Sequence, residues 1–231
     1  MSSPTATPIP VYQSVDRLLA ADMYELRNFD WLCQHIASWG LQQGPGARYG
    51  EQWSPHVRES GIWQQPEQLA RLLLLASERG VRSYCEVGVW RGYCLALVAT
   101  YLYRFSRDFR AVGVDVAPAL CVEDRWDEVQ KLVPVEIRTC DSSSIKGEPF
   151  DLVFVDGDHR YDAVRRDWEN LNTARLCAFH DCNCDYVRRG NACGGVPRFW
   201  QELRASTNRP TVEFFDSPTG LPWMGIGVVL S

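Results

Sequence analysis

The hydrophobic positions after Trp63 follow two repeating patterns, one helical and one made of short apolar runs. Four apolar residues recur at the i, i+3, i+4, i+7 spacing of one helix face: Leu69, Leu72, Leu73 and Ala76. Pro66 suits the first turn of this helix, and Gly80 suits its C-terminal end. Seven short apolar segments have the length of strands: 83–87, 111–114, 135–139, 152–155, 176–179, 211–215 and 225–230.

Further helices are predicted after the first, second, fourth and fifth of these strands. Their apolar positions include Leu95, Val98, Val164 and Leu171, and the last helix begins near Pro197. Strands that alternate with helices predict an α/β fold with a doubly wound, seven-stranded, mainly parallel sheet. The last two strands have no helix between them, so we expect an antiparallel hairpin at the edge of the sheet.

The first 60 residues do not follow this alternation. Residues 1–10 contain three prolines and predict a loose arm, and residues 11–39 have helical spacing. Four glycines and a proline then interrupt the pattern between residues 40 and 50. We therefore predict an N-terminal arm and helical extension over 1–60, which covers the main domain or a partner, and one main domain over 61–231.

The composition limits the kinds of partner that the protein is expected to bind. The net charge is −5, which argues against a broad basic surface for nucleic acid or an anionic membrane. No apolar stretch approaches the roughly 18 residues that span a bilayer. The first residues lack the basic and apolar regions of a secretory signal, so we expect a cytoplasmic protein. The helices of the N-terminal extension could mediate a homo-oligomer.

The chain has nine cysteines, which is an odd number and argues against a disulfide scaffold. We expect a reducing compartment with mostly buried thiols. The tightest group is Cys177, Cys182, Cys184 and Cys193. It contains no C-x-x-C pair, so a zinc site there is a minor alternative.

Acidic residues stand at or just after the ends of the five predicted parallel strands: Glu86, Asp115, Asp141, Asp156 and Asp181. Parallel strands end at the same edge of a sheet, where ligands bind in folds of this kind. Five carboxylates at one edge favour a ligand rich in hydroxyls and amines, a metal ion, or both. The alternative is that each acid caps the helix that follows it.

The turn after the first strand contains Glu86, Gly88 and Gly92. Glycines four residues apart let the backbone approach a ligand closely. The G-x-G-x-x-G fingerprint of dinucleotide binding is absent, and an acid stands inside the strand end. A carboxylate suits the cationic sulfonium and amino groups of S-adenosylmethionine (SAM) better than it suits the pyrophosphate of NAD.

Two later strand ends complete the expected cofactor site. Asp115 follows Gly92 by 23 residues and could accept both ribose hydroxyl protons. Asp141 and Ser142, after the third strand, could receive the adenine amine.

From about Gly61 onward the sequence resembles class I SAM-dependent methyltransferases, which have a Rossmann-like fold. The segments CEVGVWRG, FVDGDHRYDAVRRDWE and FHDCN carry a likeness to the small-molecule O-methyltransferase-like group, of the methyltransferase domain 24 and catechol O-methyltransferase-like type. The resemblance implies SAM as cofactor and a small-molecule hydroxyl as methyl acceptor. It assigns cofactor contacts to the residues already named, with Asp156 added, and implies that Gln64 and Gln65 border the cofactor.

A second site is expected at Asp156 and Asp181, which end neighbouring strands. Two carboxylates can hold Mg²⁺ or another divalent cation, which would favour the oxyanion of a substrate hydroxyl. Metal-dependent relatives have an asparagine directly after the second Asp, but Cys182 stands there, and a thiol is a poor ligand for Mg²⁺. Asp158, His159 or His180 could supply the third ligand.

His159 follows Asp156 by three residues, where the metal-dependent relatives place a lysine base. An imidazole can accept a hydroxyl proton at neutral pH, so His159 and Asp156 are the predicted catalytic residues. The alternative is that His159 caps the next helix, and we expect His180 to pack locally. Arg188 and Arg189 could meet an acidic substrate.

Two other functions also fit the sequence. One is a related metal-dependent hydroxylase-like enzyme, and the other is a non-catalytic cofactor-binding or interaction protein. An NAD dehydrogenase is disfavoured because its fingerprint is absent.

Overall fold

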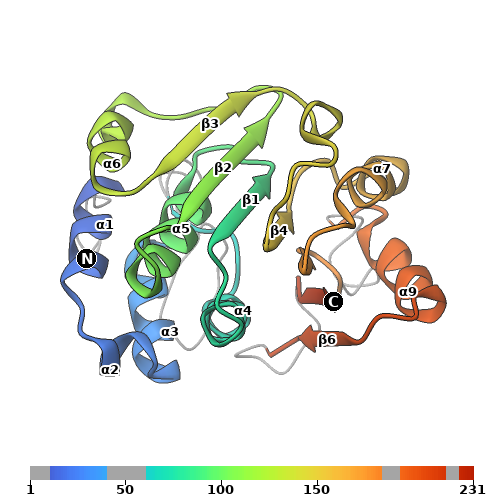
Figure 1. Cartoon of the computed structure of the whole chain (residues 1–231), viewed down its shortest axis with the longest axis horizontal. Helices are drawn as coiled ribbons and strands as arrows, with labels where there is room; N and C mark the ends of the chain where they lie inside the picture. Colours follow the sequence, from blue (N-terminus) through green and yellow to red (C-terminus); the bar gives the residue numbers. More distant parts are fainter. Residues whose placement is uncertain (1–10, 41–60, 184–192, 217–223) are drawn as a thin grey trace, which may run out of the picture.

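The chain folds around one seven-stranded sheet, shown in Figure 1. The computed structural model describes residues 11–40, 61–183, 193–216 and 224–231. The strands are β1 (Ser83–Val87), β2 (Arg110–Asp115), β3 (Val135–Thr139), β4 (Leu152–Val155), β5 (Leu176–Phe179), β6 (Thr211–Phe214) and β7 (Ile226–Leu230). The helices are α1 (Val11–Ala20), α2 (Met23–Leu26), α3 (Phe29–Ser38), α4 (Pro66–Glu78), α5 (Tyr93–Phe105), α6 (Trp126–Leu132), α7 (Tyr161–Leu171) and α9 (Val196–Ser206), with short 3₁₀ turns η2 (Val122–Asp124) and η3 (Ser142–Ile145).

The strand order is β3-β2-β1-β4-β5-β7-β6, with the first five strands parallel. Strand β7 runs antiparallel to both β5 and β6, which confirms the predicted mainly parallel sheet and its antiparallel hairpin. The order reverses between β1 and β4, so their carboxyl ends leave a crevice at the place where this class of fold binds ligands.

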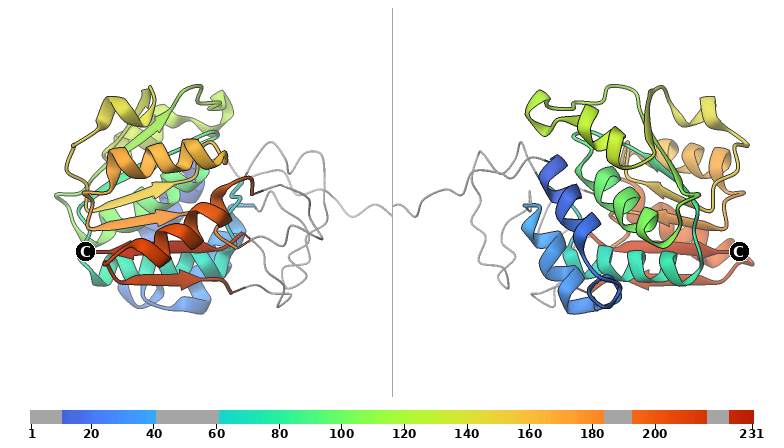
Figure 2. Two further views of the ribbon diagram at one scale, coloured as in Figure 1. Left: turned by 90° about the vertical axis from the view of Figure 1, so that its right-hand side faces the viewer. Right: turned by 60° about the vertical axis from the view of Figure 1, so that its left-hand side comes forward.

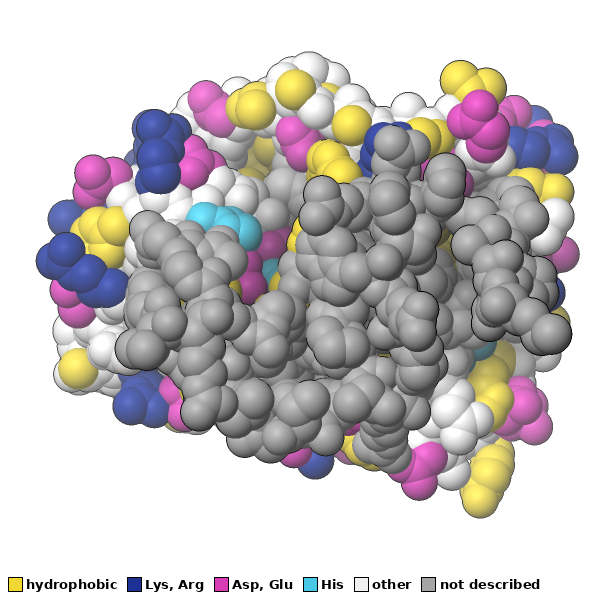
Figure 3. All heavy atoms as spheres, turned by 180° about the vertical axis from the view of Figure 1, so that it is seen from behind, with side chains coloured by type: hydrophobic (Ala, Val, Ile, Leu, Met, Phe, Trp, Pro, Cys, Tyr) yellow, Lys and Arg dark blue, Asp and Glu magenta, His cyan; other side chains and the backbone are white. Residues whose placement is uncertain are grey.

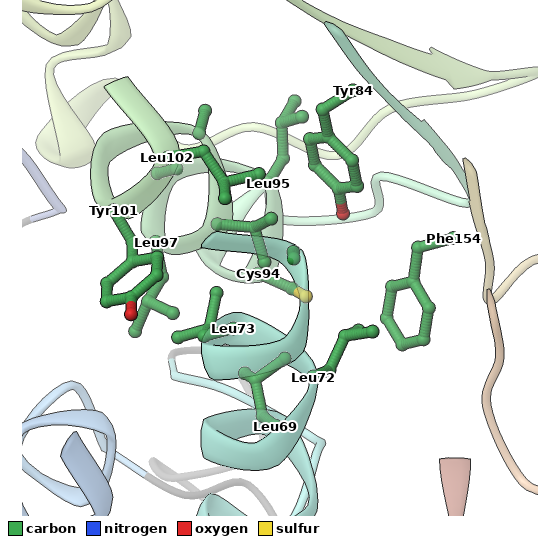
Figure 4. Packing of buried hydrophobic residues seen from close by; sticks show 14 of the residues in the cluster. Leu69, Leu72, Leu73, Tyr84, Cys94, Leu95, Leu97, Tyr101, Leu102 and Phe154 are labelled. Atoms are coloured by element: carbon green, nitrogen blue, oxygen red, sulfur yellow. The ribbon is translucent and has the colours of Figure 1, made fainter. Parts of the chain in front are cut away.

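Helices cover both faces of the sheet, as the two turned views in Figure 2 show. Strands β4, β5 and β7 are buried at every position, as expected for strands covered on both faces. One apolar layer joins the sheet to α4 and α5, and Figure 4 shows Leu72, Cys94 and Leu95 meeting Tyr84 and Phe154 there. The other layer lies under α7 and α9.

Helices α1 and α3 cover this main domain. Helix α1 packs against α5 and α6, and α3 packs against α4. The predicted helical stretch 11–39 is divided into three helices, because Asp22 forms a capping box with Glu25 and Asn28 caps α3 through the amide of Trp31. The predicted boundary at residue 60 lies outside the described residues and stays a prediction, as do the roles of Arg188 and Arg189.

The cysteines are mainly buried thiols. Cys33, Cys85, Cys94, Cys177 and Cys182 are free and buried, and Cys121 and Cys140 are free and partly exposed. Cys193 is the exception to the expectation, since it is disulfide-bonded. Across the described ranges, every helix falls short of the length and apolar character that a membrane-crossing segment requires.

Candidate functional site

A cavity of about 460 Å³ opens where β1, β4 and β5 end. Its walls come from residues 61–64, the turn between β1 and α5, and the segments that follow β4 and β5. Figure 3 shows a histidine and acidic side chains together in a recess of one face of the molecule. The cavity therefore lies at the edge where the sequence predicted a ligand.

Two glycines of the turn between β1 and α5 have backbone conformations that other residues rarely adopt. Gly88 has φ +92°, and a Cβ there would lie 2.3 Å from the carbonyl oxygen of Asp156. Gly92 has φ +81°, and its Cβ would lie 2.1 Å from the ring of Trp126. Both glycines line the cavity, and each is required because other protein atoms fill the place where a side chain would begin.

Glu86 lines the same cavity and is 1% exposed. The Tyr84 hydroxyl donates a hydrogen bond to its carboxylate at 2.5 Å. Burial raises the pKa of Glu86 to about 8. A carboxyl in this state is mainly neutral at pH 7 and becomes ionised when a cation supplies a partner.

Asp115 does not line the cavity, but it fixes the conformation of the turn between β1 and α5. Its two carboxylate oxygens accept hydrogen bonds from the amides of Trp90 and Ala117, both at 2.8 Å. Trp90 has φ +45°, a left-handed conformation that is unusual for a bulky residue. The carboxylate therefore holds the strained residue of the turn in place.

Asp141 and Ser142 lie apart from the cavity. Asp141 caps η3 by accepting from the amide of Ser143 at 2.9 Å, which is the local role that the sequence left open. Ser142 is buried, and its hydroxyl donates to Asp167 at 2.6 Å. Their predicted contact with adenine stays a prediction.

Asp156, His159, His180 and Asp181 form a cluster at the cavity wall. His180 Nδ1 lies 2.9 Å from Asp156 Oδ1, and His159 Nε2 lies 3.3 Å from Asp181 Oδ2 and 3.9 Å from Asp156 Oδ1. The Gln64 side-chain amide donates to the other oxygen of Asp156. His180 therefore belongs to the site as well as to the local packing that the sequence predicted.

Burial and neighbouring charges shift the pKa values of this cluster in opposite directions. Burial alone would raise the pKa of Asp156, but His180 and His159 outweigh it and hold that pKa well below its ordinary value. Burial raises the pKa of Asp181. Burial lowers the pKa of His180, but Asp156 and Asp181 more than offset this, so the net pKa is raised.

Three of these side chains could hold a metal ion. One oxygen or nitrogen each from Asp156, His159 and Asp181 lie within 4.8 Å of one another. Cys182 does not fit a ligand role, because burial raises its thiol pKa and its Sγ donates to the carbonyl of Phe179 at 3.2 Å. The exposed Asp158 is paired with Arg160. Of the alternatives that the sequence left open for a third ligand, His159 fits this group.

Two tryptophans of the cavity were not singled out from the sequence. The rings of Trp63 and Trp90 meet edge to face, with centroids 5.8 Å apart, and both line the cavity. Their positions next to Gln64 and inside the glycine turn were the signal that could have indicated them.

Comparison with known proteins agrees with this architecture. A family model described as a methyltransferase domain matches residues 85–176. No curated protein is similar enough to count as a relative.

Solved structures share the fold at low sequence identity. The O-methyltransferase TomG from Streptomyces achromogenes, crystallised with SAM, is 20% identical with a TM-score of 0.54, over 74% of this chain and 82% of that chain. An O-methyltransferase from Bacillus cereus in complex with SAH is 21% identical with a TM-score of 0.52, over 96% and 97%. A putative O-methyltransferase from Klebsiella pneumoniae is 18% identical with a TM-score of 0.54, over 97% and 91%.

These comparisons confirm the expected resemblance. A methyltransferase-domain model matches residues 85–176, and the chain shares its fold with solved O-methyltransferase structures, two of them crystallised with SAM or SAH.

Proposed function

We propose that this chain, in which residues 85–176 match a methyltransferase-domain model, transfers a methyl group from SAM to a hydroxyl oxygen of a small molecule. One observation carries the proposal. The glycine turn with Glu86 and the cluster of Asp156, His159 and Asp181 line the same cavity. A methyl donor held by the turn would therefore lie next to the groups that can activate an acceptor oxygen.

The turn supplies the cofactor contacts in this proposal. The backbone of the turn at Gly88 and Gly92 lines the cavity and would contact the donor, and Glu86 would pair with its cationic methionine portion. Gln64 supports this role, because its Oε1 is buried and lacks a hydrogen-bond partner among the described residues. This oxygen can accept an N–H from the donor's ammonium group.

The nucleoside portion would lie beyond the turn. Asp115 would bind the ribose hydroxyls, and Asp141 and Ser142 would border the adenine. Val116, directly after Asp115, is 71% exposed and offers an apolar surface to a planar base.

The acidic cluster is the second half of the proposed site. Asp156 and Asp181 fit a divalent cation because both are carboxylates at the cavity wall and Asp181 Oδ1 lacks a hydrogen-bond partner within the described ranges. Such a cation, when bound, lowers the pKa of an acceptor hydroxyl. Two roles of His159 fit this geometry, proton acceptor and cation ligand, and they have different consequences for metal selectivity.

The two tryptophans of the cavity indicate the chemical class of the methyl acceptor. Trp63 and Trp90 give one cavity wall a broad aromatic surface, on which an aromatic acceptor can pack. We therefore propose a small phenol-like or catechol-like hydroxyl compound as the acceptor class.

Calorimetry and product analysis test the proposal. We expect the protein to bind SAM and not NAD, and to add a methyl group to members of a phenol and catechol panel, as detected by mass spectrometry. Asp156→Asn should abolish turnover but preserve the fold, as followed by circular dichroism. Binding of NAD alone would refute the cofactor assignment, and addition of oxygen in place of methyl would favour the hydroxylase alternative.

A further inference from the structure

We infer that the cation site selects a divalent transition ion over Mg²⁺, with His159 as a nitrogen ligand beside Asp156 and Asp181. This inference rests on the proposed function only in using the same cavity. It assigns His159 a role other than the general base that the sequence predicted.

The donor atoms are already close to the spacing that an ion requires. Metal–ligand distances of about 2.0–2.2 Å place neighbouring ligand atoms roughly 3–3.5 Å apart. His159 Nε2 lies 3.3 Å from Asp181 Oδ2 and 3.9 Å from Asp156 Oδ1. The His159 side chain is 36% exposed, so it has room for the small movement that brings all three donors onto one ion.

Two buried polar atoms at the cavity wall point independently to a ligand. Asp181 Oδ1 and His180 Nε2 lack a hydrogen-bond partner within the described part of the chain. The side chains of Asp181 and His180 are only 5% and 2% exposed. Buried polar atoms without partners are costly, and an ion with its bound water can supply the missing interactions.

The surrounding residues fix the orientation of the donor set. His180 Nδ1 lies 2.9 Å from Asp156 Oδ1, and the Gln64 amide donates to Asp156 Oδ2. Outer contacts of this kind hold a metal-binding carboxylate in position. His180 and Gln64 are therefore positioning residues for Asp156.

The chemistry of the donors determines which ion fits. Mg²⁺ prefers oxygen ligands alone, whereas imidazole nitrogen suits later transition ions such as Fe²⁺, Co²⁺ and Zn²⁺. Cys182 contributes no sulfur, because its Sγ is directed to the Phe179 carbonyl. A site with one imidazole and two carboxylates thus favours a transition ion. The Nε2 lone pair of a ligating His159 is not available to a proton, so His159 is not the base in this arrangement.

The test uses the full chain freed of metal by a chelator. Calorimetric titration with Co²⁺, Mn²⁺ and Mg²⁺ measures the affinities, and the visible absorption of Co²⁺ reports its ligands without any turnover. We expect one equivalent of Co²⁺ to bind at least about tenfold more tightly than Mg²⁺, because imidazole nitrogen is a better ligand for Co²⁺ than for Mg²⁺.

Two variants separate the ligand role from a structural one. His159→Asp makes the donor set all oxygen, so Co²⁺ affinity should fall at least about tenfold and the preference over Mg²⁺ should narrow by the same factor. Asp158→Asn is the matched control, because it removes a carboxylate from the same loop outside the donor group. This control should leave both affinities and the Co²⁺ spectrum unchanged.

The inference is overturned if Mg²⁺ binds as tightly as Co²⁺, if no ion binds, or if His159→Asp leaves the Co²⁺ spectrum as it was. Calorimetry with SAM distinguishes this failure from failure of the proposed function. SAM binding without selective metal binding rejects only the ion assignment. Selective metal binding without SAM binding rejects the proposed methyl transfer and retains the ion site.

Discussion

Glu86 is the group through which we expect cofactor binding to depend on pH. Its carboxyl is buried at the cavity wall, and its pKa is raised to about 8. If the carboxylate pairs with the cationic end of SAM, binding requires the ionised form. Below pH 8 the protein must therefore release a proton from Glu86 when the cofactor binds.

The size of this effect follows from the pKa. With a value of about 8, Glu86 is about 90% protonated at pH 7, so binding there releases about 0.9 proton. SAM affinity should rise about tenfold from pH 6 to pH 7, about fivefold from pH 7 to pH 8, and less than about twofold above that.

The raised pKa of Glu86 also makes the free energy of unfolding depend on pH. The folded pKa of Glu86 is raised from 4.5 to about 8, so its contribution to stability is full below pH 4.5 and is lost as pH rises through 8. The loss is on the order of 5 kcal/mol from this one buried group. In the absence of ligand, the free energy of unfolding of Glu86→Gln should therefore fall less between pH 4.5 and pH 8 than that of the original chain.

Calorimetry in buffers of different ionisation enthalpy measures the released protons directly. Glu86→Gln is the control, because it removes the protein carboxyl and keeps the ligand's own amine titration. We expect this variant to bind SAM weakly, with an affinity that no longer rises steeply between pH 6 and pH 8. Equal proton release by the original chain and the variant would refute the assignment of this titration to Glu86.

Three other substitutions test the site and its support. Gly92→Ala should lower the free energy of unfolding by about 2 kcal/mol more than Gly80→Ala in urea titrations, because both have positive φ but only Gly92 has an aromatic ring against its Cβ position. Tyr93→Phe should cost about 1–3 kcal/mol in the same assay, since it removes the 2.9 Å hydrogen bond to buried Asp124; an unchanged midpoint would contradict this. Gln64→Leu should reduce Co²⁺ affinity roughly tenfold, because it removes a positioning contact, and calorimetry measures the change.

Much of the sheet could be predicted because each strand carries its signal locally. The run Leu152–Val155 is apolar throughout and is bounded by polar residues, and the structure contains it with the same limits. The division of residues 11–39 into three helices was not predicted. Asp22 and Asn28 cap new helices there, but the helical spacing of apolar residues continues without interruption past both positions.

The site was less predictable, since it depends on contacts between distant segments. Gln64 and Asp156 are 92 positions apart, and nothing local to either indicates their hydrogen bond. Asp141 was ambiguous for a different reason. An acid that binds a ligand at a strand end and an acid that caps a helix have the same sequence pattern, and only the structure reveals the hydrogen bond from Ser143 to Asp141.

Strand β7 has a consequence for how the molecule is made. It follows β6 along the sequence, yet it lies between β5 and β6 in the finished sheet. During synthesis the five parallel strands can associate early, whereas β6 must wait beside an incomplete edge until residues 226–230 leave the ribosome. A protease or chaperone that recognises exposed strand edges would meet its best target in that interval.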